Sequence, residues 1–211
     1  MKKSFQHIEN SQVKICAITG GIGSGKSTVA NYYEQKGFQV IRTDNLAKNI
    51  METNSNVINL LKQEFGNEIY INNKLNSKLL SDKVFNSTSP DQLEKLNKIV
   101  HPAVIEEMIN EIEILINRGE TIIFVESALI YEANLEEGFD YIIVIDAKED
   151  VRIQRTAKRM QLSEEEIRIR NREQISTEVK KNLADFVIEN NGQVEELLSN
   201  AGFILDLIKM A

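Results

Sequence analysis

Residues Gly20–Ser27 read Gly-Gly-Ile-Gly-Ser-Gly-Lys-Ser, which matches every fixed position of the phosphate-loop pattern G-x-x-x-x-G-K-[ST]. An apolar run, Val13–Thr19, precedes the loop, and Thr28–Tyr33 is expected to open a helix. A strand followed by a glycine turn and a helix brings backbone N–H groups around a phosphate. The chain is therefore expected to form an α/β fold that binds a nucleoside triphosphate.

The residues of this loop have distinct expected roles. Glycines let the backbone turn tightly and approach an anion without a Cβ atom in the way. Lys26 is expected to reach the β- and γ-phosphates and to act in catalysis, and the Ser27 hydroxyl to ligate Mg²⁺. The expected nucleotide-binding residues are Gly21, Ile22, Gly23, Ser24, Gly25, Lys26, Ser27 and Thr28. The alternative, a glycine-rich turn that merely joins a strand to a helix, does not explain the Lys-Ser pair.

Composition limits the cellular location of the chain and the kinds of partner that it binds. Hydrophobic residues make up 42% and charged residues 27% of its 211 residues, as in ordinary globular proteins. No apolar run approaches the ~18–20 residues that span a bilayer, and no secretory signal follows the N-terminus. The single cysteine, Cys16, is expected to be buried in a reducing compartment, which predicts a cytoplasmic protein with no membrane partner. The net charge of −7 argues against general nucleic-acid binding.

Positive charge gathers in one segment of this acidic chain. Residues 151–172 hold seven basic and three acidic side chains, a net charge of +4. The basic residues are Arg152, Arg155, Lys158, Arg159, Arg168, Arg170 and Arg172. Arginine suits a compact polyanion because its planar fork donates two hydrogen bonds to phosphate. The alternative, an ordinary solvated helical face with i,i+4 ion pairs, stays open on composition alone.

Strand-length apolar runs alternate with helical patterns, which is typical of a parallel sheet covered by helices on both faces. The five expected strands are Val13–Thr19, Phe38–Ile41, Thr121–Val125, Tyr141–Ile145 and Phe186–Ile188. The chain has no internal repeat and no Pro/Gly-rich linker, so residues 1–211 are expected to form a single domain. Its core is expected to comprise residues 12–44, 119–149 and 183–211.

About eighty residues separate the second and third expected strands, far more than a crossover needs. This segment, residues 45–118, is expected to be a helical insertion that binds the acceptor substrate. Its expected helices are Asn56–Phe65, Leu75–Phe85, Pro90–Ile99 and Ala103–Ile116. Since proline disfavours helix at the residue before it, His101-Pro102 is expected to lie at a joint between two helices. A capping or packing role for His101 stays open.

A second helical segment, residues 150–182, carries the positive charge and is expected to form a lid. Within it, Ser163–Glu166 reads as a capping box that starts a helix. The last expected helix, Gln193–Met210, is predicted to pack back onto the sheet.

Carboxylates follow the expected strands at their carboxyl ends, where the ligand crevice of an open α/β sheet lies. Asp44 follows the second strand and is expected to accept a proton from an attacking hydroxyl or to hold a water on Mg²⁺. Its alternative role is an N-cap for a helix that begins at Asn45. Glu126 and Asp146 end the third and fourth strands, and Glu132 lies in the next loop. Glu126 and Glu132 are each either a partner of Mg²⁺ or the loop, or a surface acid.

Together these residues resemble the dephospho-coenzyme A kinase family, from Ile15 to Gly192. The phosphate loop within Thr19–Ala30 is shared with many kinases, but the H-P element in Leu96–Pro102 and the A-D-x-V-I-x-N-x-G ending are more specific. The other matching residues are Asp44 and Ala47 in the D-x-x-A-R element, Arg155, Arg159, Leu162–Glu165, Arg170 and Gln174 in the lid, and Ala184, Asp185, Val187, Ile188, Asn190 and Gly192 in the ending.

The resemblance implies a P-loop kinase fold and transfer of the ATP γ-phosphoryl group to the ribose 3′-hydroxyl of dephospho-coenzyme A. It implies that Asp44 is the catalytic base, that Arg155 and Arg159 lie over the triphosphate, and that Asn190 lies near the adenine. The implied acceptor-binding residues are Asp44, Lys48, His101 and Pro102. ATP and Mg²⁺ are the implied cofactors, and a monomer or a weak homo-oligomer is expected.

This chain departs from the family pattern at three positions. Lys48 stands where arginine is usual, Ala128 where proline is usual, and Arg152 where glutamine is frequent. Lysine keeps the charge of arginine but loses the bidentate fork. The first two changes concern contacts to the acceptor rather than the reaction.

Three other functions compete with this one. A nucleoside monophosphate or shikimate kinase shares the loop and a lid but does not call for His101-Pro102. A GTP-binding switch needs an N-K-x-D motif, and Asn73–Asn76 lacks the Asp. A nucleotide-gated binding module without catalysis leaves Asp44 and the arginine lid without a role.

Overall fold

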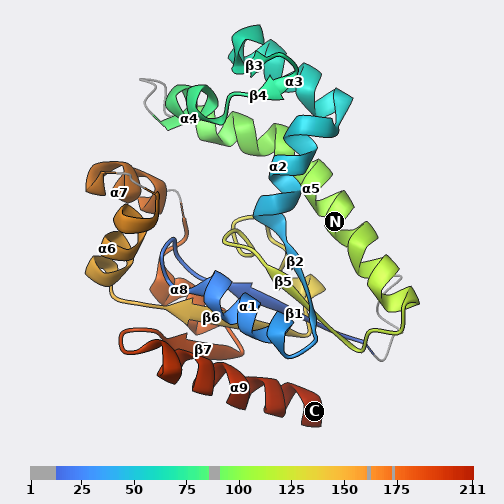
Figure 1. Ribbon diagram of the computed structural model, residues 1–211, viewed down its shortest axis with the longest axis vertical. Coiled ribbons are helices and arrows are strands. Elements are labelled where there is room, and N and C mark those ends of the chain that lie inside the picture. The colour runs from blue at the N-terminus through green and yellow to red at the C-terminus, as the bar shows by residue number, and fades with distance from the viewer. Residues whose placement is uncertain (1–12, 86–90, 161–162, 173) are drawn as a thin grey trace. The chain divides into compact units, whose positions relative to one another are not determined.

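The computed structural model describes residues 13–85, 91–160, 163–172 and 174–211 (Figure 1). It contains the expected parallel sheet, whose strands are β1 (Lys14–Thr19), β2 (Gln39–Arg42), β5 (Ile122–Glu126), β6 (Tyr141–Asp146) and β7 (Phe186–Glu189). Their order across the sheet is β2-β5-β1-β6-β7. The expected strands agree with these bounds to within one residue at either end. The α/β prediction and the five-stranded parallel sheet are therefore confirmed.

The central strand β1 shows how short apolar strands form a buried core. In parallel register, Ile15 lies opposite Ile123 of β5, and Ile18 lies opposite Ile143 of β6. These four side chains are at most 2% exposed, because helices cover both faces of a parallel sheet.

Two helices close over this sheet: α1 (Lys26–Gln35) and α9 (Val194–Met210). The Tyr33 ring of α1 stacks on Phe124 of β5 with 4.2 Å between ring centroids. Its hydroxyl donates a hydrogen bond to the carbonyl oxygen of Ala201 in α9 at 3.0 Å. Tyr33 therefore connects helix, strand and helix within the core, and its burial raises the pKa of its hydroxyl.

The segment between β6 and β7 is helical, as expected for the lid. Its helices are α6 (Glu149–Met160), α7 (Glu164–Arg172) and α8 (Thr177–Leu183). Helix α7 begins directly after Ser163, where the capping box predicts a start. A short 3₁₀ turn, η2 (Glu136–Gly138), precedes β6.

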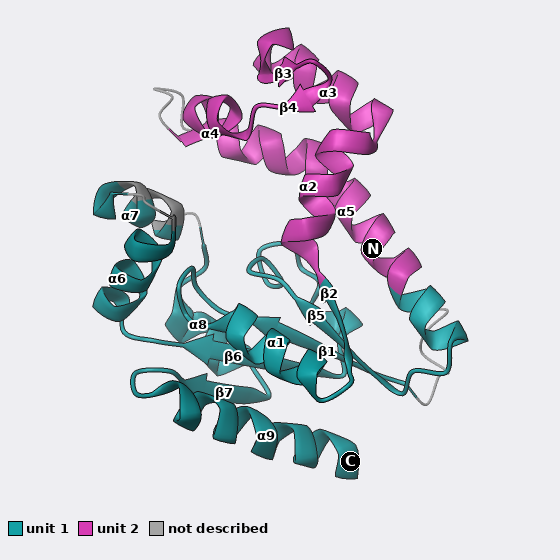
Figure 2. Cartoon of the chain, in the orientation of Figure 1, with its two compact units in different colours: residues 1–41, 112–211 teal, residues 42–111 magenta. Residues whose placement is uncertain are grey.

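The chain divides into two compact units, drawn in different colours in Figure 2. One comprises residues 1–41 and 112–211 and holds β1, β5, β6 and β7; the other comprises residues 42–111. The second unit holds α2 (Thr43–Thr53), α3 (Ser55–Phe65), η1 (Asn67–Ile69), β3 (Tyr70–Ile71), β4 (Lys74–Leu75) and α4 (Ser77–Phe85), and α5 (Gln92–Asn117) runs from this unit into the first.

A small hairpin in the second unit was not predicted. Strands β3 and β4 pair antiparallel around Asn72 and Asn73, whose φ angles are 50° and 63°. Asparagine tolerates this left-handed region, which a two-residue hairpin turn requires. Leu75 therefore belongs to β4, and the expected helix Leu75–Phe85 begins later. The Asn76 side chain accepts a hydrogen bond from the Leu79 N–H at 3.1 Å and so caps α4.

The expected joint at His101-Pro102 is wrong, because both residues lie inside the single helix α5. Proline in a helix loses one backbone hydrogen bond and strains the preceding turn. The buried side chains of α5 nevertheless continue across it at helical spacing: Val100, Val104, Met108, Ile112 and Leu115. Burial of this unbroken stripe outweighs the local cost of Pro102. The predicted start at Pro90 lies outside the described residues.

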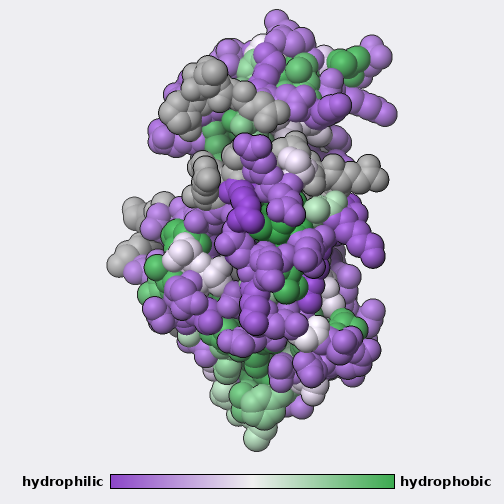
Figure 3. All heavy atoms as spheres, turned by 90° about the vertical axis from the view of Figure 1, so that its left-hand side faces the viewer, coloured by the Kyte–Doolittle hydropathy of each residue, from purple (hydrophilic) through white to green (hydrophobic). Residues whose placement is uncertain are grey.

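The face drawn in Figure 3 carries mainly hydrophilic side chains, with hydrophobic ones between them. None of the described helices combines the length and the hydropathy that a bilayer crossing requires.

Cys16 is expected to be chemically inert in the folded protein. It lies on β1 with 0% exposure, and burial, assisted by the nearby charge of Asp140, raises the pKa of its thiol to about 12. Only the thiolate attacks an alkylating agent, so native alkylation by iodoacetamide at pH 8 should be slower than that of the urea-unfolded chain by roughly 10³-fold. Mass spectrometry of timed samples measures both rates. Equal rates would contradict the burial of this thiol.

Candidate active site

The phosphate loop lies between β1 and α1 and depends on glycine at particular positions. Gly23 and Gly25 have φ angles of 77° and 110°, a region that other residues rarely adopt. A Cβ atom on Gly23 would also collide with the carbonyl oxygen of Arg152 and the hydroxyl of Thr156. Gly25 is the N-cap of α1, so the N–H groups of the first helical turn lie at the loop. This is the anion-binding geometry that the motif predicts.

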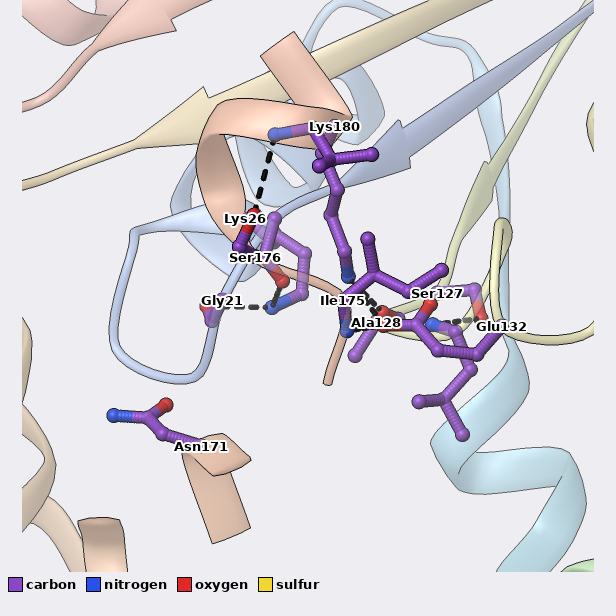
Figure 4. A network of polar contacts seen from close by, with 12 residues as sticks. Gly21, Lys26, Ser127, Ala128, Glu132, Asn171, Ile175, Ser176 and Lys180 are labelled. Carbon is purple, nitrogen blue, oxygen red and sulfur yellow. Dashed lines mark hydrogen bonds and ion pairs between the residues drawn. The ribbon is translucent and has the colours of Figure 1, made fainter. Parts of the chain in front are cut away.

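Lys26 and Ser27, the first residues of α1, carry the polar side chains of the loop. The Lys26 ammonium donates to the carbonyl oxygens of Gly20 and Gly21 at 2.9 and 3.1 Å (Figure 4). The Ser27 hydroxyl donates to a carboxylate oxygen of Glu126 at 2.7 Å. Glu126 ends β5, beside β1 in the sheet. Of the two acids weighed after the third strand, Glu126 is therefore the one that reaches the loop.

Arg155 connects the lid to the phosphate loop through Asn190. Its guanidinium donates to the Asn190 carbonyl oxygen at 3.0 Å. The Asn190 amide in turn donates to the carbonyl oxygen of Ser24 at 2.7 Å, and Asn190 is only 7% exposed. The structure thus brings together three predicted nucleotide-site residues that lie far apart in the sequence.

Composition left open whether the basic residues of the lid bind a polyanion or form an ordinary solvated helical face. Arg168 pairs with Glu149 at 2.8 Å and with Glu164 at 4.0 Å, and half of its side chain is exposed, so it behaves as part of a solvated helical face. Lys158 and Arg159 are exposed near the end of α6. The side chains of Arg170 and Arg172, and residue Leu162, lie outside the described residues.

Glu132 and Lys180 form a buried ion pair that the sequence did not predict. Their side chains are 13% and 1% exposed, and the ammonium lies 2.8 Å from the carboxylate (Figure 4). Glu132 also accepts from the Ile175 N–H at 2.9 Å, and Lys180 donates to the Ala128 carbonyl oxygen at 2.9 Å. The pair therefore attaches the start of α8 to the loop after β5. The usual proline at position 128 would offer the same carbonyl, so Ala128 costs no hydrogen bond here.

The surface-acid interpretation of Glu132 is wrong, and a partnership with Mg²⁺ stays a prediction. The described partners of Glu132 are Lys180 and Ile175 rather than the phosphate loop. No sequence signal marked Lys180, because a single lysine in a polar helix looks exposed. Asp146, at the end of β6, pairs with Lys181 at 3.3 Å.

Asp44 follows the carboxyl end of β2 but does not cap the next helix. Helix α2 begins at Thr43 with Arg42 as its N-cap, so the N-cap interpretation of Asp44 is wrong. Asp44 instead lies in the first turn, where its charge is favourable to the helix dipole. Lys48 lies one turn further along α2, and both side chains are exposed. On α5, His101 is half-buried and Pro102 is exposed.

Comparison with known proteins identifies the kind of enzyme that carries this site. A family model described as dephospho-CoA kinase matches residues 14–196. The chain belongs to the dephospho-CoA kinase family. A dephospho-CoA kinase of Oceanobacillus iheyensis is 36% identical over 183 residues, which cover 86% of this chain and 91% of that protein.

Solved structures were compared in the same way. A dephospho-CoA kinase from Campylobacter jejuni matches with a TM-score of 0.67 and 26% identity, covering 92% of this chain and 96% of that one. A shikimate kinase from Acinetobacter baumannii matches with a TM-score of 0.51 and 16% identity, covering 98% and 97%. The latter shows a shared P-loop kinase fold alone. As a dephospho-CoA kinase family member, the chain is a kinase rather than a GTP switch or a binding module.

Proposed function

We propose that this kinase transfers the γ-phosphoryl group of ATP to the ribose 3′-hydroxyl of dephospho-CoA, the last step of coenzyme A synthesis, with Asp44 as the base. The observation that carries the proposal is the complete phosphate loop, with Ser27 held by Glu126, in a chain that matches the family over residues 14–196. Ligands of open α/β sheets bind at the carboxyl ends of the parallel strands. Glu126 ends β5, and Asp44 follows the carboxyl end of β2.

The donor half of the proposed reaction uses the phosphate loop and the lid. Backbone N–H groups of residues 21–28 bind the phosphates, with Lys26 at the β- and γ-phosphates. Arg155 and Arg159 lie over the triphosphate, and Asn190 lies near the adenine. Phosphoryl transfer gains mainly from positioning and from charge neutralisation, which these cations supply.

Mg²⁺ fits the residues at the end of β5. The Ser27 hydroxyl and the Glu126 carboxylate lie 2.7 Å apart and offer the hard oxygen ligands that Mg²⁺ prefers, one or two from protein and the rest from phosphate and water. These two residues would hold the ion. When bound, it would neutralise charge on the β- and γ-phosphates.

The acceptor half uses the helical insertion, residues 45–118. Asp44 accepts the proton of the 3′-hydroxyl, whose oxygen then forms a bond to the γ-phosphorus while the bond to ADP breaks. Lys48, His101 and Pro102 contact the acceptor. We place this single kinase domain, whose lid is residues 150–182, in the cytoplasm, as a monomer or weak homo-oligomer that binds neither membrane nor nucleic acid.

An acceptor panel tests this function. Purified protein is incubated with ATP and one acceptor: dephospho-CoA, a nucleoside monophosphate or shikimate. Each reaction is run with Mg²⁺ or with EDTA, and the products are separated by chromatography and identified by mass spectrometry. Coenzyme A should form from dephospho-CoA in the Mg²⁺ arm alone. The Lys26→Ala variant provides the background rate. Turnover of another acceptor without coenzyme A formation would overturn the assignment.

A further inference from the structure

A pocket of about 370 Å³ lies at the phosphate loop. Its lining comes from the loop, from α6 and α7, from the segment that joins α7 to α8 and from the first residue of α8, and includes Gly21, Arg152, Arg168, Asn171 and Thr177. The predicted site residues do not include Arg152 or Asn171. Both nevertheless lie where a ligand of the loop would meet the lid.

Arg152 is held directly over Gly21. A Cβ atom on Gly21 would collide with the Nη1 atom of Arg152, so the guanidinium occupies the space that a side chain would take. Two hydrogen bonds hold it there: Nε donates to the Ala147 carbonyl oxygen at 3.0 Å, and Nη1 to the Asn171 side chain at 3.3 Å. Both acceptors are neutral. A guanidinium fixed in this way loses little side-chain entropy when it binds an anion.

The charge of Arg152 has no carboxylate partner among the ion pairs of the described residues, unlike that of Arg168, which is paired with Glu149. The Lys26 ammonium also contacts Gly21 and donates to its carbonyl oxygen at 3.1 Å. Two cations thus converge on one loop residue from different elements. Because the lysine of a phosphate loop reaches the β- and γ-phosphates, an anion at this point is the terminal part of the triphosphate.

Asn171 adds a donor to the same pocket. Its Oδ1 accepts from Arg152, which leaves Nδ2 as the free end of the amide. That nitrogen is buried and has no hydrogen-bond partner within the described part of the chain. A buried donor without an acceptor is unfavourable, and an anion in the pocket would satisfy it.

We infer that Arg152, oriented by Asn171, binds the γ-phosphate of ATP and makes the site discriminate ATP from ADP. The inference rests on the proposed function only in that the phosphate loop binds ATP. The glutamine that is frequent at this position in the family would keep a donor but lose the charge and the fork. Arg152 is thus a donor-site residue that departs from the residue frequent at this position.

The test measures binding of nucleotide without any acceptor, so it is independent of the acceptor assignment. Isothermal titration of the full chain with Mg²⁺ compares AMP-PNP, a non-hydrolysable ATP analogue, with ADP. Arg152→Gln should weaken AMP-PNP binding about 10- to 100-fold, as expected for a hydrogen bond to a charged group, and ADP binding less than about threefold. In turnover, the KM for ATP should rise while the KM for dephospho-CoA stays constant.

Two further variants make the outcome unambiguous. Lys209→Gln removes a positive charge from a half-exposed position on α9, outside the lid, and should leave both affinities unchanged. Arg152→Lys keeps the charge without the fork, and should weaken AMP-PNP binding by an intermediate factor; it also carries the test if Arg152→Gln does not fold. Equal losses for AMP-PNP and ADP, or no loss for either, would overturn the inference.

Discussion

Asp44→Asn is expected to lower kcat for dephospho-CoA by about 10²- to 10⁴-fold, the usual contribution of a general base. Asparagine has nearly the same shape as aspartate but cannot accept the proton of the 3′-hydroxyl. Asp44 lies in the first turn of α2, whose backbone the change leaves intact, since neither the N-cap nor a buried side chain is altered. The loss should therefore appear in the chemical step and not in folding.

The measurement separates chemistry from binding. Single-turnover kinetics report the transfer step, and titration with AMP-PNP reports the donor site, which should keep an affinity within about twofold because Asp44 does not belong to the phosphate loop. Asp206→Asn, at a largely exposed aspartate of α9, is the matched control and should behave as the parent protein. A near-normal rate in Asp44→Asn would assign the base to another residue.

Lys180→Met is expected to reduce the free energy of unfolding by about 3–5 kcal/mol, the usual cost of removing one partner of a buried ion pair. Lys180 is 1% exposed and lies 2.8 Å from Glu132. The other carboxylate oxygen of Glu132 is already buried without a hydrogen-bond partner among the described residues, so removal of the ammonium leaves a poorly compensated buried charge. Urea denaturation followed by circular dichroism measures the loss.

Two variants distinguish this ion pair from ordinary surface charges. Lys181→Met changes the next residue of the same helix, whose side chain is 25% exposed; its pairs should contribute at most about 1 kcal/mol. The double variant Lys180→Met/Glu132→Leu removes both charges and should recover most of the lost stability. A double variant as unstable as Lys180→Met would show that packing, and not the charge left on Glu132, causes the loss.

The agreement and the errors of the sequence analysis have physical causes. The central strands β1, β5 and β6 were predicted to within one residue because each is a nearly continuous apolar run that is buried on two faces. The edge strands β2 and β7, which are partly exposed, were predicted as closely from shorter apolar runs. The predictions were wrong where tertiary packing or the conformation of a turn outweighed a local sequence preference. Pro102 predicts a break, but α5 buries an unbroken stripe on both sides of it. Leu75 matches a helical pattern, but the Asn72-Asn73 turn places it in a strand.

Some residues of the candidate site could be predicted from the sequence and others could not. The phosphate loop could be identified from sequence because a strand, a turn and a helix start are local, and because its chemistry resides in consecutive residues. Arg155 and Asn190 were identified through the family pattern, but not their hydrogen bonds to each other and to Ser24. Asn171 and Lys180 were missed, since neither stands out from the polar helices around it.

The phosphate-binding loop and the α/β sheet could be predicted from the sequence because they follow from local spacing and apolar runs, and the kinase residues could be predicted because they match a family pattern. Which distant side chains meet at the loop could be learned only from the folded chain. Glu126 reaches Ser27 across 99 residues, and Asn190 reaches Ser24 across 166. Such contacts depend on strand order and burial, which bring the carboxyl ends of β1, β5 and β7 to one edge of the sheet.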